Sequence, residues 1–146
     1  MIVSSKFFNQ LNLEELYELL RLRSEVFVVE QKCIYQDIDN KDQKALHVLG
    51  FENEELVAYT RVYKSGDYPE TATIGRVLVK NSARSKGYGY DIMRATINAI
   101  EEKFETESVC LSAQTYLKTF YNNLGFKETG EEYLEDGIPH ILMIKD

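Results

Sequence analysis

The stretch Arg84-Ser-Lys-Gly87-Tyr-Gly89 places two glycines and two cations between a β-branched run and a helical pattern. If a strand ends here and a helix begins, the first turn of the helix exposes backbone N–H groups that have no intrahelical acceptor. Glycine removes side chains that would block a ligand from this backbone, and the helix dipole favours negative charge at the same place. The stretch therefore predicts a phosphate-binding corner, the alternative being a tightly packed helix start without a ligand.

Charge patterning is consistent with an anion site at this corner. The chain has a formal net charge of -7, which argues against general nucleic-acid binding. Between positions 76 and 94, however, five cations stand against a single acid, Asp91. Either these cations receive a small anion or they form an ordinary solvated face. They are Arg76, Lys80, Arg84, Lys86 and Arg94.

Two better-known phosphate motifs do not fit the corner. The GxxxxGK[ST] order of a Walker loop is absent, and the GxGxxG order of a dinucleotide-binding fingerprint fails after Gly89. The flanking segments instead predict a βαβ unit over 72–113. A β-branched run predicts a strand over 71–80, apolar residues at helical spacing from Ile92 to Phe104 predict a helix, and "SVCLSA" (108–113) predicts a second strand. Such a unit has parallel strands and a right-handed crossover.

The N-terminal part predicts a helix followed by a hairpin. Leucines at helical spacing predict a helix over about 12–30, with Asn12 as N-cap and Glu15 at the capping-box position. The segment 45–64 has apolar or alternating runs around a polar turn at Asn53 and Glu54, which predicts an antiparallel hairpin.

The C-terminal part predicts a short helix and a second hairpin. A polar loop over 65–70 separates the first hairpin from the βαβ unit. A helical segment over 116–125 stops at Gly125, and Asp136-Gly137 is a strong turn signal within 126–145. Together the segments predict an α+β fold with a mixed sheet flanked by helices.

Length and composition fit one soluble domain over residues 1–146. The chain is 44% hydrophobic and 28% charged. The first residues lack the apolar region of a signal peptide, and no 18-residue apolar run exists for a membrane span, so we expect a cytoplasmic protein. Cys33 and Cys110 lie far apart without a CxxC spacing, which predicts free thiols and no metal site.

The stretch Arg84–Gly89 resembles motif A of the GNAT acyltransferase superfamily, whose signature is [QR]-x-x-G-x-[GA]. "FYNNLGF" (120–126) is similar to motif B, and "LRSEVFVVEQKCIYQDID" with "EDGIPH" resembles the ElaA-like subfamily, so the resemblance covers almost the whole chain. It implies the GNAT acyl-CoA N-acyltransferase fold, in which the strands on either side of the motif A helix splay apart. GNAT proteins are often dimers, which leaves a homodimer open.

The resemblance also implies that acetyl-CoA supplies the acyl group. Its pyrophosphate would bind backbone amides over Arg84–Tyr90, and its pantetheine would lie along Val77–Val79, whose free N–H groups would stabilise an oxyanion. Gln114 stands where many relatives have an asparagine that bonds pantetheine. The implied cofactor-binding residues are Val77, Leu78, Val79, Arg84, Ser85, Lys86, Gly87, Tyr88, Gly89, Tyr90 and Gln114.

Direct transfer to an amine needs a base for the ammonium and an acid for the departing thiolate. Tyr121 of motif B matches the family's general acid, and a phenol with a pKa of about 10 stays protonated at neutral pH. The alternative is that Tyr121 only packs. The glutamate that some relatives use as base falls at about Thr73 here and does not carry over. His47 and His140, the two histidines, are the candidates for base or relay, with a water relay as the alternative.

Acidic residues in two segments either attract a cationic amine or are ordinary solvated acids. They are Glu30, Asp37, Asp39 and Asp136. Arg23 and Arg76 lie within an apolar helix face and a strand, where they either pair with those acids or hold a substrate carboxylate, which would favour an amino acid or peptide. Cys33 could carry an acyl intermediate, but it has no histidine neighbour in sequence, which favours inert packing.

Three functions follow from these patterns. The leading one is an acetyl-CoA-dependent N-acetyltransferase that acts on the primary amine of a small molecule or peptide by direct transfer in a ternary complex. The second is a non-catalytic module that senses acyl-CoA. The third is a protein-interaction domain whose glycine corner is only structural.

Overall fold

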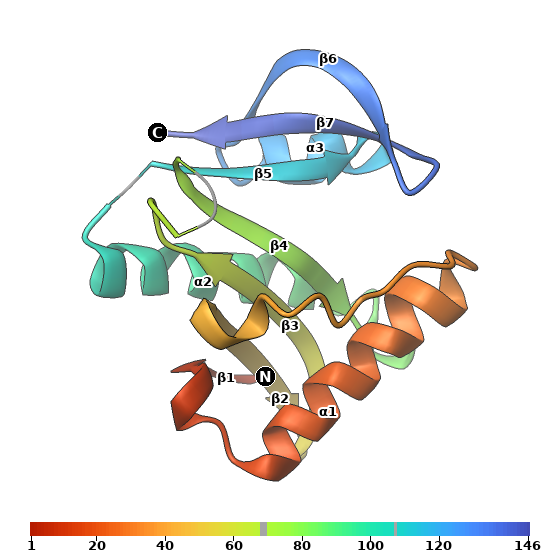
Figure 1. Ribbon diagram of the computed structural model, residues 1–146, viewed down its shortest axis with the longest axis vertical. Helices are drawn as coiled ribbons and strands as arrows, with labels where there is room; N and C mark the ends of the chain where they lie inside the picture. The colour runs from red at the N-terminus through yellow and green to blue at the C-terminus, as the bar shows by residue number, and fades with distance from the viewer. Residues whose placement is uncertain (68–69, 107) are drawn as a thin grey trace.

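The computed structural model describes residues 1–67, 70–106 and 108–146. Within them, strands form one mixed seven-stranded sheet (Figure 1). The strands are β1 (Ile2–Phe7), β2 (Leu46–Glu52), β3 (Glu55–Tyr63), β4 (Ala72–Val79), β5 (Val109–Gln114), β6 (Lys127–Glu135) and β7 (Ile138–Lys145). Their order across the sheet is β1-β2-β3-β4-β5-β7-β6, and neighbours run antiparallel except for β4 and β5, which are parallel. The predicted α+β fold, both hairpins and the parallel βαβ pair are confirmed.

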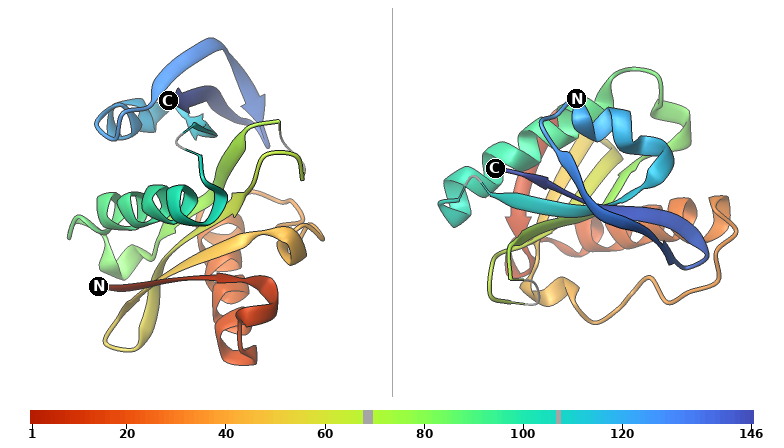
Figure 2. Two further views of the ribbon diagram at one scale, coloured as in Figure 1. Left: turned by 90° about the vertical axis from the view of Figure 1, so that its left-hand side faces the viewer. Right: turned by 90° about the horizontal axis from the view of Figure 1, so that it is seen from above.

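Helices cover both faces of this sheet. α1 (Leu13–Arg23) lies on one face, whereas α2 (Tyr88–Phe104) and α3 (Lys118–Asn122) lie on the other (Figure 2). The predicted start of α1 is confirmed. Asn12 Oδ1 accepts a hydrogen bond from the Glu15 N–H at 2.8 Å, and Glu15 Oε1 accepts one from the Asn12 N–H at 2.9 Å. This reciprocal capping box satisfies two of the donors that a helix start leaves free.

The second half of the predicted N-terminal helix winds more widely than an α-helix. The π-helical segment η2 (Ser24–Glu30) follows α1 directly. At its end, the Cys33 N–H donates to the Val28 carbonyl at 3.1 Å, a bond that spans five residues. The helix therefore reaches its predicted end, but its last turns differ from the prediction. Wide turns of this kind occur often beside functional sites.

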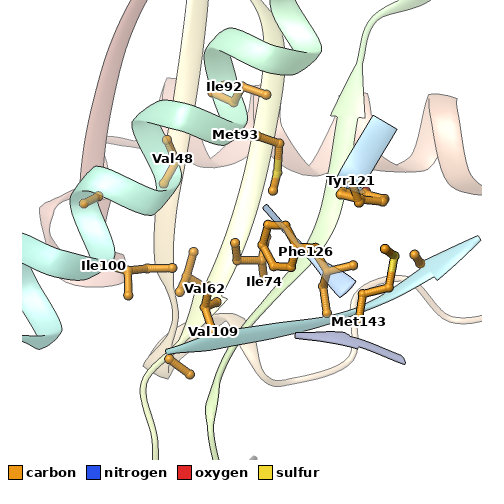
Figure 3. Close-up of a cluster of buried hydrophobic side chains, with 14 of the residues drawn as sticks. Val48, Val62, Ile74, Ile92, Met93, Ile100, Val109, Tyr121, Phe126 and Met143 are labelled. Carbon is orange, nitrogen blue, oxygen red and sulfur yellow. The ribbon is translucent and has the colours of Figure 1, made fainter. Parts of the chain in front are cut away.

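The core is divided between the two faces of the sheet. Under α2, Ile92 and Met93 are fully buried, and they belong to a cluster that includes Ile74 of β4 and Phe126 (Figure 3). Under α1, Leu22 is also fully buried and packs in a second cluster with strand residues. Because burying such a side chain contributes about 1.5–3 kcal/mol, these faces hold the helices against the sheet.

β4 and β5 pair only over their first residues and then separate. Their register ends at Ile74 opposite Leu111, and Figure 1 shows the two strands diverging beyond it. On its other edge β4 bulges, because Arg76 and Val77 together lie opposite one residue of β3, between the pairs Gly75–Arg61 and Leu78–Tyr59. Arg76 has a positive φ of 50°. A bulge bends a strand and increases its twist, which accounts for the direction that β4 takes away from β5.

The chain around Gly125 differs in part from the predicted helix over 116–125. A 3-10 turn, η5 (Thr115–Leu117), precedes α3, which is only five residues long. The predicted stop at Gly125 is confirmed. Gly125 has a φ of 95°, the Phe126 N–H donates to the Tyr121 carbonyl at 3.1 Å, and the Gly125 N–H donates to the Asn122 carbonyl at 3.0 Å. These two bonds form a Schellman motif.

Three further sequence predictions concern the loop over 65–70, membrane spans and metal sites. The predicted loop over 65–70 includes positions 68 and 69, which lie outside the described residues. Across the described ranges, no helix is both long enough and apolar enough to cross a membrane. Within the same ranges, His, Cys, Asp and Glu side chains form no group of three that could hold a metal ion.

Candidate active site

A cleft of about 750 Å³ opens where β4 and β5 separate. Its walls come from η2, β4, the glycine corner, β5, α3 and the tip of the β6–β7 hairpin. The predicted site residues that line it are Glu30, Arg76, Val77, Leu78, Val79, Arg84, Ser85, Gly87, Tyr88, Gly89, Gln114, Tyr121, Asp136 and His140. Those outside its lining are Arg23, Asp37, Asp39, His47, Lys86 and Tyr90. A separate hollow of about 630 Å³ along the exposed face of α1 contains none of them.

Gly87 is the residue at which the strand-to-helix corner turns. It precedes α2 with a φ of 79°, and no atom lies within 4 Å of the place where a Cβ would stand. The positive φ therefore favours glycine here, and the open space in front of it leaves the backbone accessible. The following N–H groups of α2, at its first turn, have no intrahelical acceptors. The corner thus presents free N–H groups and the positive end of a 17-residue helix to the cleft.

Gly89 has a different reason to be glycine. A Cβ at this position would stand 3.2 Å from Cε1 of Phe120, so the missing side chain lets α2 approach the start of α3. Tyr90 also packs on Phe120, with ring centroids 4.7 Å apart. We predicted that both glycines keep the backbone accessible to a ligand. Gly87 has that geometry, whereas at Gly89 the space that a side chain would need is occupied by Phe120.

The five cations around the corner each pair with a carboxylate. Arg84 lies 2.7 Å from Glu30 of η2, and its Nε donates to the Val79 carbonyl at 3.0 Å. Lys86 lies 3.2 Å from Glu52, which also accepts a hydrogen bond from the Tyr88 hydroxyl. Lys80 pairs with Glu55, Arg94 with Asp91 and Arg76 with Asp37. An anion at this corner would therefore bind to backbone N–H groups and compete with Glu30 for Arg84.

The outer edge of β4 faces the cleft at Val79. The Lys80 N–H donates to the Val57 carbonyl of β3 at 2.7 Å, so Lys80 is bonded to β3. Hydrogen-bonding direction alternates along an antiparallel pair, and Val79 opposite Ala58 therefore points its N–H and carbonyl away from β3. Arg84 Nε bonds that carbonyl from this side. Since β5 has already diverged, the Val79 N–H has no strand to pair with and is available in the cleft.

Tyr121 brings an unpartnered hydroxyl to the same cleft from α3. Its side chain is 5% exposed, and its ring packs edge-on against Phe126 and Phe120. Among the described residues its hydroxyl makes no hydrogen bond. Burial, followed by the charge of nearby Tyr116, raises the pKa of Tyr121 above its ordinary value. The group is therefore a protonated donor at neutral pH, directed into the cleft.

The two histidines lie in different places. His47 is fully buried, with Nδ1 at 2.6 Å from the Tyr59 hydroxyl and Nε2 at 2.9 Å from the Asp42 carbonyl, and burial lowers its pKa. Because it lies outside the cleft lining, it is not placed to exchange a proton with a ligand there. His140 does line the cleft, with Nε2 at 3.3 Å from Glu135 Oε2. Glu135 was missed by sequence reasoning, although it precedes the predicted Asp136.

Arg23 and Arg76 belong to a network of three arginines and three aspartates. Arg23 is fully buried; its Nε donates to Asp37 at 2.9 Å and its Nη1 donates to Asp42 at 2.6 Å. Arg76 Nε donates to Asp37 at 2.7 Å. Of the two alternatives for these arginines, the structure shows pairing with acids. Arg61 completes the network by binding Asp39 and Asp42, at 2.8 Å and 2.9 Å.

This network perturbs the acids within it. Burial alone would raise the pKa of Asp39, but hydrogen bonds and charge from Arg61, with further charge from Arg76, hold it at about 2. Asp42 is shifted in the same direction, because Arg23 and Arg61 outweigh its burial and lower its pKa. Asp37 and Asp39, for which the sequence left attraction of an amine or plain solvation as alternatives, are paired with arginines instead. Sequence reasoning missed Arg61 and Asp42, which lie far apart in the chain.

Cys33 lies at the edge of the cleft, where the loop after η2 meets the β6–β7 tip. It lines the cleft and is partly exposed, and its Sγ lies 3.5 Å from the Asp136 carbonyl. Thr73, at the position of the glutamate that some relatives use, also lines the cleft, with its Oγ1 donating to the Thr71 carbonyl at 2.8 Å. A hydroxyl committed to a backbone carbonyl is a poor base, consistent with leaving Thr73 out of the prediction.

The sheet parts beside a glycine corner, a helix N-terminus lies at one end of the resulting cleft, and a buried tyrosine lines it. Together these features define an acyl-CoA N-acyltransferase fold. The Acetyltransferase (GNAT) domain family matches residues 9–146, and the chain belongs to this family. The resemblance found in the sequence is confirmed.

The similar proteins include ElaA. Protein ElaA of Escherichia coli (strain K12) is 44% identical over 140 residues, covering 94% of this chain and 92% of that protein. The crystal structure of Escherichia coli ElaA superposes with a TM-score of 0.93 at 40% identity, covering 100% of both chains. An acyl-CoA N-acyltransferase from Pseudomonas aeruginosa gives a TM-score of 0.94 at 39% identity, again covering 100% of both chains.

Proposed function

We propose that this protein, acting as a single domain over residues 1–146, transfers an acetyl group from acetyl-CoA to the primary amine of a small molecule or peptide. Transfer is direct, within a ternary complex. One observation carries the proposal: Val79, whose N–H points away from β3, and Tyr121, whose hydroxyl makes no hydrogen bond to another described residue, line the same cleft, which the glycine corner closes with free helix amides.

The corner and the edge of β4 hold acetyl-CoA in this proposal. The N–H groups from Gly87 to Tyr90 bind the pyrophosphate, because they lack acceptors and carry the positive end of the α2 dipole. Arg84 exchanges Glu30 for a phosphate oxygen and strengthens that contact. The pantetheine lies along Val77–Val79 and bonds the side-chain amide of Gln114, which lines the cleft at the end of β5.

Two groups of the chain act on the thioester. The Val79 N–H donates to the carbonyl oxygen, which becomes an oxyanion when the amine attacks, and a fixed donor at that point is worth several kcal/mol of barrier. As the C–N bond forms and the C–S bond breaks, the Tyr121 hydroxyl gives its proton to the departing thiolate. Its raised pKa keeps the phenol protonated at neutral pH, so a proton is available when the thiolate leaves. The nitrogen then loses one further proton to become an amide, and Tyr121 takes up a proton from solvent.

Release of free CoA thiol tests the proposal. Acetyl-CoA is mixed with the protein and a panel of primary amines that includes diamines, amino acids and short peptides. Thiol release that depends on one amine supports the transferase. Tight binding of acetyl-CoA with no thiol release across the panel contradicts it and points to an acyl-CoA sensor. Absence of binding to well-folded protein contradicts both and points to an interaction domain.

A further inference from the structure

The tip of the β6–β7 hairpin places a histidine and a carboxylate together at the cleft. His140 of β7 and Glu135 of β6 both line it, and His140 Nε2 lies 3.3 Å from Glu135 Oε2. The histidine side chain is 8% exposed and the glutamate side chain is 52% exposed, so the carboxylate stands at the solvent side of the ring. The type I′ turn at Asp136 and Gly137, with φ values of 51° and 78°, fixes this pairing.

Hydrogen bonding determines which nitrogen of His140 can accept a proton. Nδ1 lies 2.7 Å from the Ile138 carbonyl, and a carbonyl can only accept a hydrogen bond. In the neutral ring the proton therefore sits on Nδ1, which leaves the lone pair of Nε2 directed toward Glu135. The ring is held by the nearly parallel ring of Tyr133, at a centroid distance of 6.2 Å and an angle of 25°.

Other charged groups near the cleft do not compete for this role. Arg76 is paired with Asp37, and Arg84 is paired with Glu30. The remaining titratable groups of the surrounding elements that line the cleft are Cys33, Tyr35, Tyr88, Tyr116, Tyr121 and Asp136. Tyr133, on the strand next to His140, shares a hydrogen bond with the Ser112 hydroxyl. Among the described side chains that line the cleft, His140 thus has the one nitrogen that can accept a proton, Nε2, because arginine stays protonated and amide nitrogens are not basic.

His140 also lies on the side of the sheet opposite Tyr121. Ile141 and Met143 of β7 belong to the core cluster under α2 and α3, the cluster that contains Tyr121. Side chains alternate along a strand, so His140 points to the face that α1 covers. His140 and Tyr121 therefore line the cleft from opposite faces of the sheet.

We propose that His140 is the general base of the transfer and that Glu135 is its positioning partner, an inference that rests on the proposed function. The acceptor ammonium enters beside Glu135 and gives one proton to Nε2 of His140. The carboxylate stabilises the resulting imidazolium, and the neutral amine attacks the thioester carbon. After transfer His140 releases its proton to solvent, so the turnover yields amide, CoA thiol and one proton.

His140→Asn tests the base role, because its side-chain amide can still donate to the Ile138 carbonyl while the basic Nε2 is gone. At pH 7 we expect kcat/KM for the amine to fall about 10²–10⁴-fold, with the Kd of acetyl-CoA unchanged. The deficit should shrink as the pH approaches about 10, where an alkylamine is deprotonated in solution and needs no base. His140→Gln, which keeps a polar group at the Nε2 position, should show the same pattern if His140→Asn does not fold.

Glu135→Gln tests the partner. It should lower kcat about two- to fivefold, the effect of a half-exposed ion pair, with little change in the KM for acetyl-CoA. Glu132→Gln, an exposed acid of β6 outside the cleft lining, is the matched control and should leave kcat unchanged.

The pH dependence separates the possible outcomes. Suppose that the wild type is active and the His140 variants either keep full activity or lose the same factor at every pH. Either result would overturn the base role and leave the proposed function standing. A wild type that binds acetyl-CoA but releases thiol with no amine would overturn the proposed function and the base role with it.

Discussion

Nε of Arg76 donates a 2.7 Å hydrogen bond to Oδ1 of Asp37, and this contact ties the bulge of β4 to the loop after η2. Asp37 is 5% exposed and also binds Arg23. Arg76, one of the two arginines that line the cleft, is therefore already paired with a carboxylate of its own chain. Each of the three aspartates contacts two of the three arginines, so losing one arginine leaves two aspartates with a single partner each and the network with excess negative charge.

Replacing Arg23 by methionine should strongly destabilise the fold. Asp37 and Asp42 would each keep one arginine, Arg76 and Arg61, but the buried network would carry one uncompensated negative charge, and removing one partner of a buried ion pair costs about 3–5 kcal/mol. The free energy of unfolding in urea measures the loss. Arg21→Met on the same helix is the control, because Arg21 binds two half-exposed glutamates and should contribute less than about 1 kcal/mol. Equal losses in both variants would contradict the network's role.

Stability should fall as the pH is lowered from about 4 to 2. The pKa of Asp39 is about 2 in the folded protein against an ordinary 3.8, so the unfolded chain binds more protons in this window and acid favours unfolding. Asp42, whose pKa is also lowered, acts in the same direction. Urea unfolding of wild type and Asp39→Asn should differ most above pH 4 and converge near pH 2. A difference that is constant across this range would argue against the pairing of Asp39 with Arg61.

Tyr121→Phe should remove the acid without disturbing the fold. We expect kcat to fall about 10²–10⁴-fold, while the Kd of acetyl-CoA stays within about twofold. The free energy of unfolding should change little, because the hydroxyl that is removed makes no hydrogen bond to another described residue. Tyr17→Phe, on the exposed face of α1, is the control. Full activity of Tyr121→Phe would show that the thiolate obtains its proton elsewhere.

Local signals predicted most of the elements. The capping box at Asn12 and the glycine at position 125 act within a few residues, and both are found where the sequence predicts them. The apolar pattern did not distinguish the α-helical from the π-helical part of the N-terminal helix, because a segment of seven residues with Val26 as its buried side chain is too short to separate the two helical periods. The bulge at Arg76 was not predicted either, since it depends on pairing with β3 and on Asp37, thirty-nine positions away.

The candidate site was predicted where a motif defines it and missed where only the fold brings residues together. Gly87 and Tyr121 belong to motifs, and both line the cleft. Nothing in the sequence separated His47 from His140; only the sheet shows that one is enclosed and the other lines the cleft. Glu135 could have been considered beside Asp136, because a two-residue turn brings the strand that carries His140 back alongside the strand that carries Glu135.

Calorimetric titration with acetyl-CoA tests the central claim, that the glycine corner binds this molecule. Gly87→Val and Gly130→Val both force a β-branched residue into a positive φ, 79° and 71°, with open space around the new Cβ. Each should cost about 1–2 kcal/mol of stability, but only Gly87 lies at the cleft. We predict micromolar binding by wild type and Gly130→Val, with Gly87→Val weakened at least about tenfold because it obstructs the helix amides. Equal binding by all three proteins, or none by folded wild type, would contradict the account.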